Sequence, residues 1–151
     1  MKRFLFSIAL LFTALAGCSN HEGESTAPKS ELNVMSYNIR YANASDKGDA
    51  AWDARKEASI RMIRDVRPDV IGFQEPRRQQ VAYLVEQLPE YGHIEMGRDF
   101  GAKDDPGEHL MIMYRRSKYI LLDSGFFWIS PTPECPSRGW DAMCRCVTVW
   151  V

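Results

Sequence analysis

The chain has 151 residues, 26% of them charged, and a formal net charge of −1, which is enough length for one domain of common size. Without the basic residues Lys2 and Arg3, which lie in a predicted export signal, the charge becomes −3. The composition therefore excludes general affinity for nucleic acid through a positive surface, and any recognition of phosphate has to come from a local site.

The first seventeen residues are typical of an export signal. Two basic residues precede an apolar run over positions 4–16 that is too short to span a bilayer. The run ends in LAGC at 15–18, which resembles the lipobox of bacterial lipoproteins; the alternative is a small-residue cleavage site with an incidental cysteine. We therefore expect residues 1–17 to be removed, Cys18 to be acylated, and the protein to be an exported lipoprotein anchored to a membrane, facing the periplasm or on the cell surface.

Residues 18–30 comprise Cys18 and a small, polar segment without hydrophobic periodicity, which is typical of a flexible tether. The folded domain is expected over 31–151. Its three cysteines allow at most one intrachain disulfide, with Cys135 as one half and its partner undecided. Cys144 and Cys146 fall on one face of a predicted strand, and we favour their interpretation as small core residues.

The domain begins with a predicted strand and helix. Both sets of alternating residues over 32–38 can be buried, which predicts an interior strand covered on two faces. After a polar loop over 41–52, Asp53 is expected to cap a helix that ends at Arg67-Pro68. The predicted apolar face of this helix consists of Ala58, Met62, Ile63 and Val66.

A second strand and helix follow. Residues 69–75 predict a short buried strand, and Pro76 is expected to open a helix. The apolar face of that helix is predicted to be Val81, Leu84, Val85 and Leu88. A strand–helix–strand order predicts parallel pairing of the two strands through a right-handed crossover. Later apolar segments, near 91–96, 109–114, 119–129 and 144–151, predict further strands, with antiparallel pairing among the first three.

Two polar residues end the predicted parallel strands. The carboxyl ends of such strands share one edge of the sheet, where open α/β sheets bind ligands, so Asn38 and Glu75 are expected to lie side by side. An amide and a carboxylate provide hard oxygen ligands, which suit Mg²⁺. The alternatives are an Asx turn at Asn38 and a helix-entry role for Glu75.

A wider set of motifs occurs in order along the chain: SYNIR (36–40), WDARK (52–56), PDVIGFQE (68–75), GE (107–108), LDSGFFW (122–128) and GWDA (139–142). Together they resemble the endonuclease/exonuclease/phosphatase family of DNase I-like phosphoesterases. The resemblance implies a four-layered α/β sandwich, of which this chain would be the amino-terminal half, with a mixed sheet and helices on one face. It also implies hydrolysis of a phosphate ester that depends on Mg²⁺ or Mn²⁺.

The resemblance assigns roles to four residues. It implies that Glu75 binds the metal, Asn38 lies beside the scissile phosphate, Glu108 orients a catalytic imidazole and Arg145 contacts the phosphate. From its position alone, Glu108 is equally consistent with a solvated charge at a strand entrance, and Arg145 with an ordinary surface residue. The substrate is open among nucleic acid, phospholipid headgroup, inositol phosphate and sugar phosphate.

The chain departs from the family in the residues that move protons. The His-x-Asp, Gly-Asp-x-Asn and Asp-His motifs of the family do not occur, and none of His21, His93 and His109 fits the catalytic histidine. We therefore expect these 151 residues to be inactive alone. A non-catalytic binding lipoprotein and a truncated gene product are the alternatives.

Overall fold

The computed structural model describes residues 31–101 and 105–151, and Glu31–Val151 is one compact unit. The predicted export signal (1–17), the predicted acylation site Cys18 and the predicted tether (18–30) lie outside the described residues. Within the described ranges, no helix is long and apolar enough to cross a membrane.

A four-stranded mixed sheet forms the centre of the domain. Its strands are β1 (Val34–Asn38), β2 (Val70–Arg77), β3 (Tyr91–Gly97) and β4 (Glu108–Arg115), in the order β1-β2-β4-β3. β1 and β2 are parallel, as predicted, and β4 is antiparallel to both of its neighbours. Asn38 pairs in register with Gln74, so the ends of the two parallel strands meet at one edge of the sheet.

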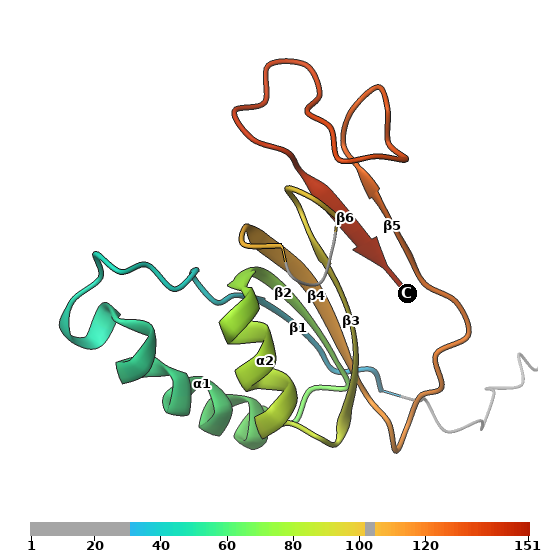
Figure 1. Cartoon of the computed structure of the whole chain (residues 1–151). Helices are drawn as coiled ribbons and strands as arrows, with labels where there is room; N and C mark the ends of the chain where they lie inside the picture. The colour runs from blue at the N-terminus through green and yellow to red at the C-terminus, as the bar shows by residue number, and fades with distance from the viewer. Residues whose placement is uncertain (1–30, 102–104) are drawn as a thin grey trace, which may run out of the picture. The chain divides into compact units, whose positions relative to one another are not determined.

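Two helices cover one face of this sheet, as Figure 1 shows: α1 (Trp52–Val66), which follows the short 3-10 helix η1 (Gly48–Ala50), and α2 (Arg78–Gln87). The core lies between the helices and the sheet. Burying each of its large aliphatic side chains contributes roughly 1.5–3 kcal/mol. Its members are Ile39, Ile60, Ile63, Ile71, Phe73, Val81, Leu84, Leu88, Tyr91, Met111 and Met113.

The details of the helices correct the sequence interpretation. α1 begins at Trp52 after Ala51, which makes no side-chain cap, so Asp53 is not the capping residue. The buried face of α1 is Ser59, Ile60 and Ile63, whereas Ala58, Met62 and Val66 are exposed. The helix ends as predicted, because Arg67 takes a left-handed conformation. The predicted apolar face of α2 is confirmed: Val81, Leu84 and the C-cap residue Leu88 are buried, and Val85 is partly buried.

The second face of the sheet corrects another expectation. β1 is an edge strand whose outward residues Val34, Ser36 and Asn38 are exposed, so it is not covered on two faces. A separate two-stranded antiparallel sheet, β5 (Gly125–Trp128) and β6 (Val147–Trp150), follows later in the chain. Residues 119–124 are not a strand, because no neighbouring strand pairs with them.

The cysteines also differ from expectation. Cys144 and Cys146 precede β6, and both are exposed, so neither is a core residue. Cys135 is exposed too, and all three thiols are free in the structure. Although Cys146 is exposed as a residue, partial desolvation of its thiol, followed by the effect of neighbouring Cys144, raises the pKa of Cys146 above the ordinary thiol value.

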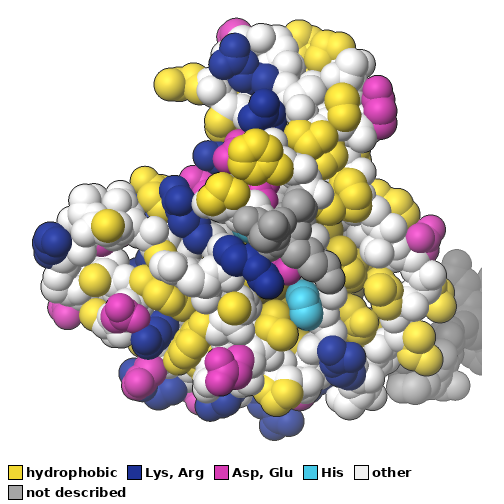
Figure 2. All heavy atoms as spheres, in the orientation of Figure 1, with side chains coloured by type: hydrophobic (Ala, Val, Ile, Leu, Met, Phe, Trp, Pro, Cys, Tyr) yellow, Lys and Arg dark blue, Asp and Glu magenta, His cyan; other side chains and the backbone are white. Residues whose placement is uncertain are grey.

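Large apolar side chains remain exposed between β4 and the chain end. Ile120 and Leu122 are 85% and 94% exposed, and Trp150 and Val151 are exposed as well. Figure 2 shows hydrophobic side chains collected along the side of this view where Figure 1 places the segment before β5. An apolar surface of this kind marks a contact site or an aggregation liability.

We therefore expect the full chain to bind a hydrophobic dye such as anilinonaphthalene sulfonate under native conditions. Leu122→Gln should lower the bound-dye fluorescence while changing the free energy of unfolding by less than about 0.5 kcal/mol, because the side chain is solvated. Val66→Gln, at an exposed site on α1, is the matched control and should leave dye binding unchanged. Cooperative unfolding without any dye binding would contradict this expectation.

Candidate active site

One cavity gathers all four residues that the sequence assigned to a site. Its volume is about 210 Å³, and it lies where β1, β2 and β4 approach the segment that leads into β6. The cavity is lined by Asn38, Gln74, Glu75, Arg98, Glu108, His109, Leu110, Arg145, Cys146 and Val147. Residues more than a hundred positions apart in the chain therefore form one polar site.

Asn38 and Glu75 are in direct contact. The Asn38 side-chain amide donates a 2.7 Å hydrogen bond from Nδ2 to Glu75 Oε1, and the backbone N–H of Tyr41 donates to Oε2 over 3.3 Å. Asn38 Oδ1 accepts a hydrogen bond from the backbone N–H of Arg40 at 2.9 Å, which is an Asx turn. The Asx turn and the contact with the carboxylate therefore coexist, because they use opposite ends of the same amide.

The backbone of Glu75 is strained. Its φ is 69°, a left-handed conformation that costs a non-glycine residue of the order of 1–3 kcal/mol. The pairing of β2 with β4 shifts by one residue between Gln74 and Arg77, so Glu75 lies in a β-bulge. Bulges and strained residues cluster at functional sites, where they redirect a side chain. Pro76 belongs to this bulged strand, and α2 begins only at Arg78, which corrects the predicted helix start.

Glu108 contacts an arginine that the sequence analysis missed. Arg98 donates from Nη1 to Glu108 Oε2 at 2.7 Å, whereas the resemblance assigned Glu108 to a catalytic imidazole. The backbone oxygen of Arg98 accepts a hydrogen bond from the buried indole of Trp128 on β5. Arg98 lies in a loop next to an aspartate, a pattern common to solvated turns, so no sequence signal distinguished it.

Arg145 points toward an acidic partner. Its Nη1 lies 3.8 Å from Asp99 Oδ1, and the side chain is 43% exposed. A pair of that length and exposure contributes little to stability. Arg145 therefore remains able to contact an anion in the cavity, beside Arg98.

Asp105 organises the loop that carries Arg98 and Asp99. Its carboxylate accepts hydrogen bonds from the backbone N–H groups of Asp99, Phe100 and Gly107 at 2.6–2.8 Å. Burial raises the pKa of Asp105, but these three backbone N–H groups outweigh it and hold the pKa below the ordinary aspartate value. A Cβ at Gly97 would lie 2.3 Å from Asp105 Cβ, so glycine is required there.

His109 makes its contacts within the fold, beside the cavity that it helps to line. It is buried, and its Nε2 lies 3.0 Å from the backbone oxygen of Asp105. Its Nδ1 faces Glu95 at 3.7 Å, and Glu95 also contacts Arg78. These contacts anchor β3 and β4 beneath the cavity.

Two other polar residues, one in β1 and one just after it, do not line the cavity. Tyr37 faces the helices, where its hydroxyl lies 2.9 Å from Ser59 Oγ. Arg40 makes a bidentate pair with Asp46 at 2.7 and 2.9 Å. This pairing lowers the pKa of Asp46 and raises that of Arg40.

Glu75 is the carboxylate suited to hold a metal ion. In the described ranges, no group of three or more His, Cys, Asp or Glu residues could form a complete metal centre. Mg²⁺ needs only one or two carboxylates and takes water and phosphate oxygens for the rest of its octahedron. Each Glu75 oxygen accepts one hydrogen bond, which leaves lone pairs for a metal, so the residues present fit Mg²⁺ or Mn²⁺.

The chain is similar to several solved structures. An endonuclease/exonuclease/phosphatase family protein from Bacteroides thetaiotaomicron is 39% identical with a TM-score of 0.72, over 79% of this chain and 42% of that one. A mannosyl-6-phosphatase from the same species is also 39% identical with a TM-score of 0.72, over 80% of this chain and 45% of that one. The family protein from Bacteroides vulgatus is 36% identical with a TM-score of 0.71, over 79% and 44%.

This chain belongs to the endonuclease/exonuclease/phosphatase family. It has that family's mixed α/β fold and spans less than half the length of these solved structures. A curated relative, uncharacterized protein L388 of Acanthamoeba polyphaga mimivirus, is 31% identical over 93 residues, which are 59% of this chain and 34% of that protein. No protein-family model matches the sequence.

The hydrogen bonds to the Asp105 carboxylate predict that this residue stabilises the fold in a pH-dependent way. Asp105→Asn should lower the free energy of unfolding by about 1–3 kcal/mol at pH 7, because it removes a charged acceptor of three N–H groups. Since the folded-state pKa is depressed, the wild-type advantage is complete above about pH 4 and is lost as the pH falls through the folded-state pKa.

Urea unfolding of both proteins from pH 7 to pH 2 measures this difference. Asp65→Asn, at an exposed position on α1, is the control and should change stability little at any pH. A destabilisation by Asp105→Asn that does not vary with pH would contradict the assigned role of the charge.

Proposed function

We propose that this chain supplies the metal- and phosphate-binding part of an enzyme that hydrolyses a phosphate ester with Mg²⁺ or Mn²⁺. The observation that carries the proposal is the convergence of Asn38, Glu75, Glu108 and Arg145 in one cavity. Asn38 ends β1, Glu75 lies in the bulge near the end of β2, and the other two residues come from distant segments. The phosphoesterase named among the similar structures supports the same class of reaction.

Each residue has a distinct task in this proposal. Glu75 would hold the metal ion, which when bound would neutralise negative charge on the phosphate oxygens. Arg145 would contact the phosphate, and Asn38 would lie beside it while keeping Glu75 in place through the 2.7 Å hydrogen bond. Glu108 would hold Arg98 beside the phosphate through its own 2.7 Å contact.

The proton-transfer groups are not part of the cavity. Its lining carries one histidine, and His109 is engaged with the Asp105 backbone and faces Glu95. Hydrolysis also requires a group that orients or deprotonates water. We therefore propose that these 151 residues bind metal and phosphate but do not turn over substrate by themselves.

The substrate we propose is a small phosphate ester rather than a nucleic acid polymer. The formal charge of −1 provides no excess of Lys and Arg for counterion release, on which non-specific nucleases depend. A similar structure is named as a mannosyl-6-phosphatase, which favours a sugar phosphate. Export through residues 1–17 and acylation of Cys18 would place the reaction at a membrane surface outside the cytoplasm.

Metal binding tests the assignment of Glu75. Titration of the chain with Mn²⁺, followed by the electron paramagnetic resonance signal of free Mn²⁺, should show one site in the presence of inorganic phosphate. Glu75→Gln should weaken that site by about tenfold or more, equivalent to about 1.4 kcal/mol, because the amide lacks the carboxylate charge. The amide oxygen can still accept the Asn38 hydrogen bond, so the fold should persist.

Glu86→Gln, at an exposed position on α2, is the matched control and should bind Mn²⁺ like the wild type. Equal affinity in the Glu75→Gln variant would contradict the metal assignment. Hydrolysis of p-nitrophenyl phosphate by the 151-residue chain would contradict the proposed need for additional proton-transfer groups.

A further inference from the structure

A second and larger cavity lies next to the candidate active site. Its volume is about 730 Å³, which is in the range of small-molecule pockets. It shares no lining residue with the active-site cavity. Its walls come from the loop after β1, the beginning of α1 and the β2–α2 junction: Ala42, Asn43, Ala44, Asp46, Ala51, Trp52, Asp53, Lys56, Arg77, Gln79 and Tyr83.

Two chain segments connect this cavity to Glu75. Arg77 follows Glu75 by two residues on β2, and Ala42 follows Tyr41, whose backbone N–H donates to the Glu75 carboxylate. A group bound in the larger cavity would therefore lie beside the catalytic edge of the sheet. The chain thus links the wall of the larger cavity directly to the Glu75 carboxylate.

The wall of the cavity is held in place by buried contacts. Gln80 is fully buried; its Oε1 accepts the N–H of Ala42 at 2.7 Å and its Nε2 donates to the Arg40 oxygen at 3.0 Å. Arg55 donates to the same Arg40 oxygen at 2.7 Å and to the Ala50 oxygen at 3.0 Å. The loop is thus fixed at both ends, so the cavity is formed before any ligand binds.

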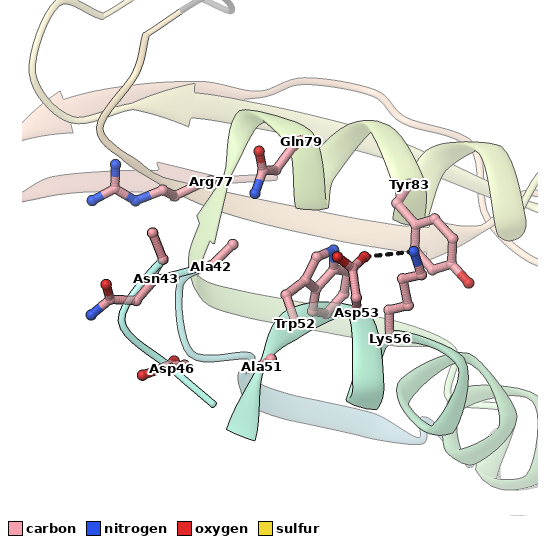
Figure 3. A pocket seen from close by; sticks show the side chains of 11 residues that line it. Ala42, Asn43, Asp46, Ala51, Trp52, Asp53, Lys56, Arg77, Gln79 and Tyr83 are labelled. Carbon is pink, nitrogen blue, oxygen red and sulfur yellow. Dashed lines mark hydrogen bonds and ion pairs between the residues drawn. The ribbon is translucent and has the colours of Figure 1, made fainter. Parts of the chain in front are cut away.

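The charges that line the cavity are largely paired. Asp46 is bound by Arg40, and Asp53 accepts a 2.7 Å contact from Lys56, as Figure 3 shows for the second pair. Arg77 donates to the Pro106 oxygen and lies over the ring of Tyr41. Neither a bare acidic cluster for a metal nor a cluster of free cations for a polyanion is present in this lining.

The remaining lining is polar, small and aromatic. Figure 3 shows Arg77 and Gln79 across from the loop that carries Asn43 and Asp46, with Trp52 and Tyr83 toward the other end. Trp52 and Tyr83 meet edge to face, with ring centroids 5.8 Å apart. Amide side chains both donate and accept hydrogen bonds, as the hydroxyls of a sugar do, and the aromatic wall suits its apolar C–H groups.

We propose that this cavity binds a neutral sugar ring, belonging to the molecule whose phosphate occupies the Asn38–Glu75 site. This inference rests on the proposed function and adds a separate subsite for the sugar part of the substrate. The three alanines in the lining leave room for the ring, and the paired charges make a neutral ligand preferable to a second phosphate.

Ligand-observed NMR on the full chain tests the proposal, with methyl α-D-mannopyranoside, methyl α-D-glucopyranoside and inorganic phosphate as probes. We expect at least one glycoside to bind without metal. Ala44→Trp should weaken that binding by about tenfold or more, because the indole fills the cavity from an exposed loop position. Ala58→Trp, at an exposed position on α1 outside the cavity, should bind like the wild type.

Two further variants separate loss of sugar binding from a disturbed loop and from loss of the metal site. Gln79→Ala removes an exposed lining amide and should also weaken glycoside binding if Ala44→Trp disturbs the loop. Glu75→Gln should leave glycoside binding unchanged while it weakens Mn²⁺ binding, so a failure of the metal site is distinguishable from a failure of the sugar site.

Absence of binding by both glycosides, or binding that neither cavity variant alters, would overturn the proposal. Phosphate binding that is sensitive to Ala44→Trp would show an anion site instead.

Discussion

The hydrogen bond between Asn38 and Glu75 joins the end of β1 to the bulge near the end of β2, and the arrangement of the candidate site depends on it. Parallel pairing brings the carboxyl ends of β1 and β2 to the same edge of the sheet. The bulge and the left-handed backbone of Glu75 then hold its carboxylate at that edge, 2.7 Å from the Asn38 amide. The strained backbone conformation therefore occurs at the residue for which we propose a metal-binding role.

The rest of the site is assembled around that edge by contacts between distant segments. Asp105 holds the loop that carries Arg98 and Asp99 through three backbone N–H groups. Trp128 of β5 fixes the backbone of Arg98 from the second sheet. Arg145, ahead of β6, approaches Asp99. The short second sheet therefore contributes to the site even though much apolar surface around it stays exposed.

The sequence predicted the two helices and most of the strands because these depend on local patterns, although residues 119–124 are not a strand. The four residues singled out by the family resemblance line one cavity. Asn38 and Glu75 could be paired before the structure because strand ends meet in a parallel sheet. The buried face of α1 was predicted correctly only at Ile63. Ser59 is buried beside Tyr37, a long-range contact that hydrophobic spacing does not reveal. Arg98 was missed for the same reason, because its place in the cavity depends on a hydrogen bond to Glu108, which lies across a loop.

The sequence of β1 alone also could not predict that this strand lies at the edge of the sheet. Its two alternating sets are both suited to burial, but β1 pairs only with β2 in the described sheet, and one of its two sets is exposed. Which strand lies at an edge is decided by the pairing of all the others. The larger cavity beside the site has the same origin, because its walls combine a loop, a helix start and a strand–helix junction.

The most direct test of the central claim is a crystal structure of the chain soaked with Mn²⁺ and inorganic phosphate. Our account predicts an anomalous peak for Mn²⁺ within coordination distance of the Glu75 carboxylate, and phosphate between that ion and the side chains of Asn38 and Arg145. A metal peak away from Glu75, or phosphate held only by other surface arginines, would contradict it.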